Sequence, residues 1–134
     1  MTRTRNALRR AAVVACTMVG AGALVLGTGG VASADTARVD VWSASCHGTM
    51  YSRYLSTGWE VRNWVDNQGM EQCSGWMDWT PDGNTSSYYG LRNRIWLGAN
   101  FSYSTAYLSD NSPALTRVCV QAANDAHARC SAWW

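Results

Sequence analysis

Two histidines, His47 and His127, are the side chains of this 134-residue chain best suited to acid–base chemistry near neutral pH. With a nearby carboxylate they could act as general acid and base, which would make the protein a small hydrolase. The chain holds no G-x-S-x-G, H-E-x-x-H, P-loop or dinucleotide motif to support this reading. An isolated histidine is more often a surface or capping residue, so a hydrolase is the weakest of our hypotheses.

Glu60 and Asp78 raise a second catalytic possibility, the paired carboxylates of a glycosidase. The register predicted below places Glu60 opposite Trp76 instead, which separates the two acids. We therefore expect a non-enzymatic protein with no catalytic residues and no cofactor.

Cysteines are the next group with possible chemistry. Cys16 lies in the leader segment, and four remain: Cys46, Cys73, Cys119 and Cys130. An even number in a short exported chain predicts two disulfides. Metal binding is the rival interpretation, but there is no C-x-x-C pair and the histidines are not spaced as ligands.

The pairing of the cysteines follows from the pattern near the C-terminus. Apolar and polar residues alternate on both sides of Asn124-Asp125, which predicts a hairpin with Cys119 opposite Cys130. In a non-hydrogen-bonded pair the Cα atoms approach to about 4.5 Å, close enough for a disulfide. Cys46–Cys73 then follows by elimination.

Aromatic residues give the best indication of a binding site. The chain has eight Trp, and four of them fall on the polar face of a predicted strand, while two Tyr lie in a Ser/Gly-rich loop: Trp42, Trp64, Trp76, Trp96, Tyr88 and Tyr89. Exposed rings flanked by polar groups can stack on sugars or serve as protein-interface anchors. The alternative is that these rings form a second small core. Our leading hypothesis is a secreted binding protein for an extracellular protein or a polysaccharide.

A second hypothesis is a secreted protease inhibitor or protein toxin. It would use a disulfide-braced loop, such as residues 80–90, whose rigidity limits the entropy lost on binding. Nothing in the chain matches an inhibitory loop motif.

The first 34 residues have the pattern of a leader segment and are not expected to be part of the fold. Residues 1–34 combine four Arg, an apolar run from Ala11 to about Leu26 and an Ala32-Ser33-Ala34 end, which predicts a Sec signal peptide cleaved before Asp35. The run is too short and too Gly-broken to be retained as a membrane span. The whole chain has a net charge of +2, but residues 35–134 keep seven Arg against nine acids, which gives −2. Without Lys and with this charge, nucleic-acid binding is not expected.

Residues 35–134 are expected to form a single secreted all-β domain. Period-two alternation recurs along residues 39–42, 59–66, 70–79, 94–103 and 118–132, and no segment has a helical apolar period. Six to eight short strands at this spacing predict a small antiparallel β-sandwich or barrel, and the two disulfides would brace it. An acidic surface of this kind favours a monomer.

Two hairpins are predicted in detail. Asn67-Gln68-Gly69 is read as a three-residue loop that pairs residues 59–66 with 70–79 and sets Trp64 opposite Gln72. The last hairpin, continued to the chain end, sets Trp134 opposite Leu115. The layout resembles that of small exported β-proteins of actinomycete-type bacteria, and the Cys-x10-Cys spacing before an aromatic end is similar in outline to their protease inhibitors.

Overall fold

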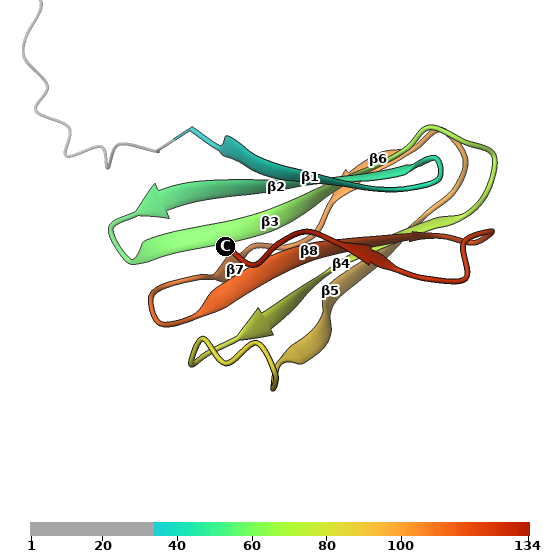
Figure 1. Ribbon diagram of the computed structural model, residues 1–134. Coiled ribbons are helices and arrows are strands. Elements are labelled where there is room, and N and C mark those ends of the chain that lie inside the picture. Colours follow the sequence, from blue (N-terminus) through green and yellow to red (C-terminus); the bar gives the residue numbers. More distant parts are fainter. Residues whose placement is uncertain (1–33) are drawn as a thin grey trace, which may run out of the picture.

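The computed structural model describes residues 34–134, so the predicted signal peptide lies outside the described residues except for Ala34. Within them the chain is all-β, and two antiparallel sheets face one another as in a sandwich (Figure 1). The predicted fold class is confirmed. No helix in this range is long and apolar enough to cross a membrane.

The first sheet, sheet A, has the order β1-β2-β3-β6, and β7 also pairs with β3. Its strands are β1 (Thr36–Ser43), β2 (Cys46–Leu55), β3 (Gly58–Asn67), β6 (Ser102–Ser104) and β7 (Leu108–Ser109). Sheet B has the order β5-β4-β8-β9. Its strands are β4 (Cys73–Thr80), β5 (Tyr89–Leu97), β8 (Leu115–Ala122) and β9 (Arg129–Cys130). The described residues thus form nine strands, slightly more than the six to eight predicted, because β6, β7 and β9 are only two or three residues long.

The core lies between the sheets and consists of the inward members of each alternation. Sheet A contributes residues such as Met50, Val61 and Val65, and sheet B contributes residues such as Met77 and Val118. The sheets come close at one point, where a Cβ on Gly75 would lie 2.2 Å from Val65 Cγ2. A side chain larger than hydrogen therefore does not fit at residue 75 without movement of Val65.

Both predicted disulfides are confirmed. Cys119 and Cys130 are directly opposite on β8 and β9, with their Cα atoms 4.1 Å apart. Cys46 at the start of β2 is bonded to Cys73 at the start of β4, which links sheet A to sheet B across the sandwich.

The predicted hairpin of residues 59–66 with 70–79 is wrong. β3 pairs with β2, so Glu60 lies opposite Arg53 and Trp64 opposite Thr49. β4 is in the other sheet, and its neighbours are β5 and β8. The residues after Asn67 cross between the sheets instead of turning back, held by a hydrogen bond from Gln68 N to the Ser45 carbonyl.

The predicted strand 94–103 is interrupted after Leu97. Asn100 has a φ of +56°, and the turn around it carries the chain from β5 of sheet B to β6 of sheet A. Phe101 and Tyr103, which alternate with Leu97 in the sequence, are consequently exposed.

The predicted register holds at Cys119 and Cys130, but beyond Cys130 it is shifted by one residue. Trp134 exchanges two backbone hydrogen bonds with Thr116, not with Leu115. Because a one-residue shift exchanges the two faces of a strand, Trp134 packs against the core while Trp133 lies on the outer side, against Arg117.

Candidate functional site

The six aromatic residues predicted as a site are divided between the two outer faces of the sandwich. Trp42 and Trp64 lie on sheet A and are exposed, and Trp96 lies exposed at the edge of sheet B. Trp76 is also on sheet B, but only 6% of it is exposed, which corrects the expectation of an exposed ring. Tyr88 and Tyr89 lie where the β4–β5 loop joins β5. The structure therefore does not form one face from all six rings.

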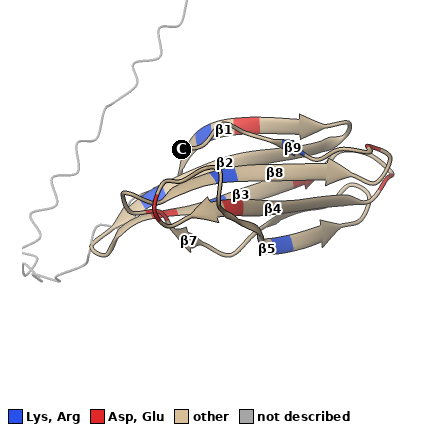
Figure 2. Cartoon of the chain, turned by 60° about the horizontal axis from the view of Figure 1, so that its bottom comes forward, with Lys and Arg blue, Asp and Glu red and all other residues tan. Residues whose placement is uncertain are grey.

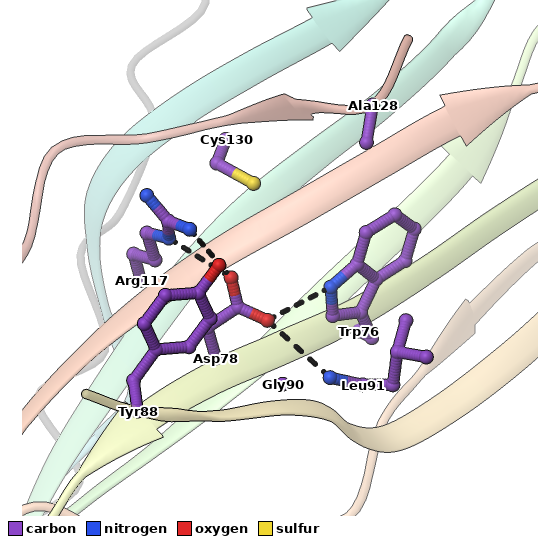
Figure 3. A pocket seen from close by; sticks show the side chains of 8 residues that line it. All are labelled: Trp76, Asp78, Tyr88, Gly90, Leu91, Arg117, Ala128 and Cys130. Carbon is purple, nitrogen blue, oxygen red and sulfur yellow. Dashed lines mark hydrogen bonds and ion pairs between the residues drawn. The ribbon is translucent and has the colours of Figure 1, made fainter. Parts of the chain in front are cut away.

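An open pocket of about 470 Å³ lies on the outer side of sheet B. Figure 3 shows the side chains that line it, which come from β4, β5, the β4–β5 loop, β8 and the β8–β9 hairpin: Trp76, Asp78, Tyr88, Gly90, Leu91, Arg117, Ala128 and Cys130. Two of the predicted residues, Trp76 and Tyr88, are thus brought together here. Pockets of this volume are typical of small-ligand sites.

Asp78 is the central polar residue of this pocket. Its Oδ1 accepts hydrogen bonds from Trp76 Nε1 at 3.0 Å and from the backbone N–H of Leu91 at 3.3 Å. Its Oδ2 accepts from Arg117 Nε at 2.9 Å, and Arg117 Nη2 lies 2.8 Å from the same oxygen (Figure 3). A buried carboxylate needs such partners, because an unpaired buried charge is costly.

Arg117 contacts two aromatic rings that lie next to each other. Its guanidinium carbon lies 4.8 Å from the centre of the Tyr88 ring and 4.7 Å from that of Trp133. The two rings also contact each other edge-on, with centres 5.5 Å apart. Tyr88 is therefore positioned by cation–π and aromatic contacts, although it lies at the end of a loop.

Trp76 is buried on an outer face because its neighbours cover it. On one side it is opposite Cys119, whose disulfide to Cys130 borders the pocket. On the other side the Arg94 guanidinium lies 5.2 Å from its ring centre and 4.0 Å from that of Trp96. Arg94 thus joins Trp96 to the pocket, and it makes no ion pair within residues 34–134.

The sulfurs of Cys119 and Cys130 lie within 4.8 Å of an Asp78 carboxylate oxygen, a grouping that resembles a set of metal ligands. Both sulfurs are joined in a disulfide. Zinc binds thiolates, so this arrangement does not supply the ligands that a zinc site requires.

The loop of residues 80–90 was expected to be braced by a disulfide, but neither disulfide includes a residue of the loop. It is ordered by local hydrogen bonds instead. Asp82 Oδ1 accepts from the Thr80 hydroxyl and the Asn84 N–H, and Asn84 Oδ1 accepts from the Ser86 N–H. The hydrogen bond from the Asn84 N–H, together with the bond from the Thr80 hydroxyl, lowers the pKa of Asp82.

The two histidines do not form one site. His47 Nε2 lies 3.2 Å from Asp40 Oδ1, and the His47 ring stacks on Trp42 at 3.9 Å with an angle of 11° between the planes. His127 donates its backbone N–H to Asp125 Oδ1 in the β8–β9 turn. No contact between the imidazoles is found among the described residues, so the structure gives the hydrolase hypothesis no support.

A polar surface surrounds the Trp42–His47 stack on the outer side of sheet A. The Thr49 hydroxyl donates to Asp40 Oδ1 at 2.6 Å. On the next strand Asp66 accepts hydrogen bonds from Ser102 and Gln68, which lower its pKa. Trp64 lies on this same surface but outside the pocket of sheet B.

Several residues of the pocket were missed by the sequence reasoning. Asp78 was considered only as a carboxylate partner of Glu60, and Arg117 looks like an ordinary outward residue of its strand. Their pairing depends on β4 lying next to β8. No face was assigned to Trp133 from the sequence, and its contact with Arg117 depends on a one-residue shift near the C-terminus. The only available signal was the alternation that puts Asp78 on the same face of β4 as Trp76.

Charged residues are scattered over both sheets without one large patch of either sign (Figure 2). No protein family model matches the chain, and no curated protein sequence and no solved structure matches it. The fold and the pocket define the protein as an all-β, disulfide-braced sandwich with a preformed pocket on one sheet. This pocket is the basis of the function proposed next.

Proposed function

We propose that the protein is a secreted, non-enzymatic binding protein and that its pocket on sheet B binds a glycan. The observation that carries this proposal is the combination of aromatic walls, Trp76 and Tyr88, with polar groups of Asp78 and Arg117 that are fixed by their own contacts. Sugars present apolar ring faces to aromatic side chains and hydroxyls to such polar groups.

The fixed state of Asp78 favours binding over catalysis. Both of its oxygens already accept hydrogen bonds, and Arg117 pairs with it at 2.8 Å. A general base needs a free lone pair directed at a substrate proton. A preorganised ion pair instead offers its remaining N–H groups and lone pairs as stationary hydrogen-bond partners.

Secretion is part of the proposal. The leader of residues 1–34 and the two disulfides support it, since structural disulfides form in oxidising compartments. Asp35, the first residue after the proposed cleavage, accepts a hydrogen bond from the Tyr107 hydroxyl and pairs with Arg62. Mass spectrometry of the exported protein should give a chain that begins at Asp35, and an uncleaved chain would contradict the assignment.

The binding proposal is tested by titration with soluble oligosaccharides, such as cellohexaose and chitohexaose, followed by tryptophan fluorescence and calorimetry. We expect a saturable signal for at least one of them. Tyr88→Ala removes an exposed wall of the pocket and should weaken binding about tenfold or more.

The matched control is Tyr54→Ala, which removes a tyrosine of similar exposure from sheet A. It should bind as the wild type does. The proposal would be overturned if Tyr88→Ala and the wild type bound with equal affinity, or if no glycan tested gave a binding signal.

A protein partner is the second candidate, and one observation favours it. A hollow of about 330 Å³ lies between the edge strands β5 and β6. Three aromatic residues around it are among the most exposed large hydrophobic residues of the range 34–134: Trp96 at 57%, Phe101 at 66% and Tyr103 at 64%. Clustered exposed apolar side chains are typical of interaction surfaces.

The protease-inhibitor form of this second candidate is tested with a panel of secreted proteases. Wild-type protein should inhibit at least one of them, and Phe101→Ser should lose that inhibition while the fold is retained. If Phe101→Ser inhibited as well as the wild type, the contact with the protease would lie elsewhere. If the wild-type protein inhibited none of the proteases, the inhibitor hypothesis would be ruled out.

A further inference from the structure

A second hollow, of about 270 Å³, is lined by residues from the start of β3, from the connection between β7 and β8 and from the C-terminal end. Two indole rings, Trp59 and Trp134, form part of its lining, and the buried side chain of Asp110 faces it. The remaining lining residues are small or apolar: Ser112, Pro113, Ala114 and Leu115. This hollow is separate from the pocket of sheet B, with which it shares no lining residue.

Asp110 is unusual because it is buried without a positive partner. Only 6% of the residue is exposed, and within residues 34–134 it makes no ion pair. Its side chain accepts one hydrogen bond, from the Thr116 hydroxyl to Oδ1 at 2.5 Å. Its environment therefore lacks the cation that usually accompanies a buried carboxylate.

The two indole rings contact each other and a cation of the chain itself. They meet edge to face, with centres 5.7 Å apart and an angle of 85° between their planes. The Arg38 guanidinium from β1 lies 5.3 Å from both ring centres and donates Nε to the Ser52 hydroxyl. The rings thus already hold one cation, but Arg38 does not reach Asp110.

From these observations we infer that the Trp59–Trp134–Asp110 hollow is a binding site for an alkylammonium group. The carboxylate supplies the negative charge, and the indole rings together with the apolar residues of the lining accommodate the alkyl part. A neutral molecule of the same shape would fill the hollow but would leave Asp110 unpaired. An anion would be repelled by the carboxylate.

The test uses tetramethylammonium as the probe and tert-butanol as a neutral comparison of similar shape. Two-dimensional NMR of the full exported protein reports on the indole N–H signals of all eight Trp. We expect saturable shifts at Trp59 and Trp134 with tetramethylammonium, and no such shifts with tert-butanol at equal concentration. Equal responses to both probes, or shifts confined to other Trp, would overturn the assignment.

Asp110→Asn provides the second arm. Asn retains an acceptor for Thr116 and nearly the same volume, so the fold should be preserved while the charge is lost. Affinity for tetramethylammonium should fall about tenfold or more. The control Glu71→Gln removes an exposed acid elsewhere and should leave the affinity unchanged. Unchanged affinity in Asp110→Asn contradicts the inference, whatever the outcome of the glycan titrations.

Discussion

Asn63 of sheet A donates a hydrogen bond from its side-chain Nδ2 to the backbone carbonyl of Trp76 in sheet B, at 3.1 Å. The same nitrogen lies 3.2 Å from the carbonyl oxygen of Cys119 on the neighbouring strand. Asn63 is fully buried, so these bonds cross the core of the sandwich. One polar side chain thus fixes the position of one sheet against the other, directly behind the pocket.

Replacing Asn63 by Leu should therefore destabilise the protein strongly. Two backbone carbonyls would lose a buried donor, and unsatisfied buried groups cost about 1–3 kcal/mol each. We expect a loss of about 3 kcal/mol in the free energy of unfolding, measured by urea denaturation. Gln68→Leu, which removes an exposed side-chain bond to Asp66, should cost under about 0.5 kcal/mol. Similar losses for the two variants would show that Asn63 does not link the sheets.

The ion pair in the pocket gives a second prediction. Arg117→Met leaves the Asp78 carboxylate buried without its cation, which should cost about 3 kcal/mol. Arg129→Met removes an exposed partner of Asp125, 3.5 Å away, and should cost no more than about 1 kcal/mol. Thermal denaturation of the two variants at the same ionic strength makes the comparison. If Arg117→Met lowered the stability no more than Arg129→Met does, Asp78 would not depend on Arg117 as its buried partner.

Alternation along the strands predicted which face each residue takes, but it does not state which strands pair. This is why the fold class and the Cys119–Cys130 pairing were predicted correctly, since both depend on neighbouring residues. β3 and β4 were placed in one hairpin because a Gly69 turn is compatible with either a hairpin or a crossing. Only contacts distant in sequence, such as the pairing of Trp76 with Cys119 in β8, decide between them.

The candidate site was harder to predict for the same reason. The Asp78–Arg117 pair joins residues 39 positions apart, and its environment includes Trp133 only because of a one-residue shift. A shift of this size changes no local propensity, yet it exchanges the inner and outer faces. Two of the six predicted aromatic residues, Trp76 and Tyr88, line the pocket, and the distribution of the six over two sheets could be known only from the strand order.

That shift predicts different effects for the two C-terminal tryptophans. Trp134 packs against the core cluster, so Trp134→Ala should cost about 3 kcal/mol of stability. Trp133 lies on Arg117 at the surface, and Trp133→Ala should cost about 1 kcal/mol. Denaturant titrations of both variants provide the measurement. A larger loss of stability for Trp133→Ala than for Trp134→Ala would instead support the register in which Trp134 lies opposite Leu115.

Asp110 predicts an unusual dependence of stability on pH. Burial raises its pKa from an ordinary 3.8 to about 6, although the Thr116 hydrogen bond opposes this. Between these values the folded chain retains a proton that the unfolded chain has lost. The contribution of Asp110 to the free energy of unfolding is therefore fully present at low pH and is lost as the pH rises through about 6. The total loss is roughly 3 kcal/mol.

Asp110→Asn should remove this contribution. The variant should match the wild type near pH 3.5 and be more stable than it above roughly pH 6.5, since the difference develops between the two pKa values. Asp66, Asp82 and Asp125 have lowered pKa values and contribute with the opposite sign, so their effect cancels only in the difference between variant and wild type. Urea denaturation of both proteins across this range measures it. A difference that does not change with pH would mean that Asp110 ionises in the folded protein as it does in water, because the hollow beside it then admits enough solvent to stabilise the charge.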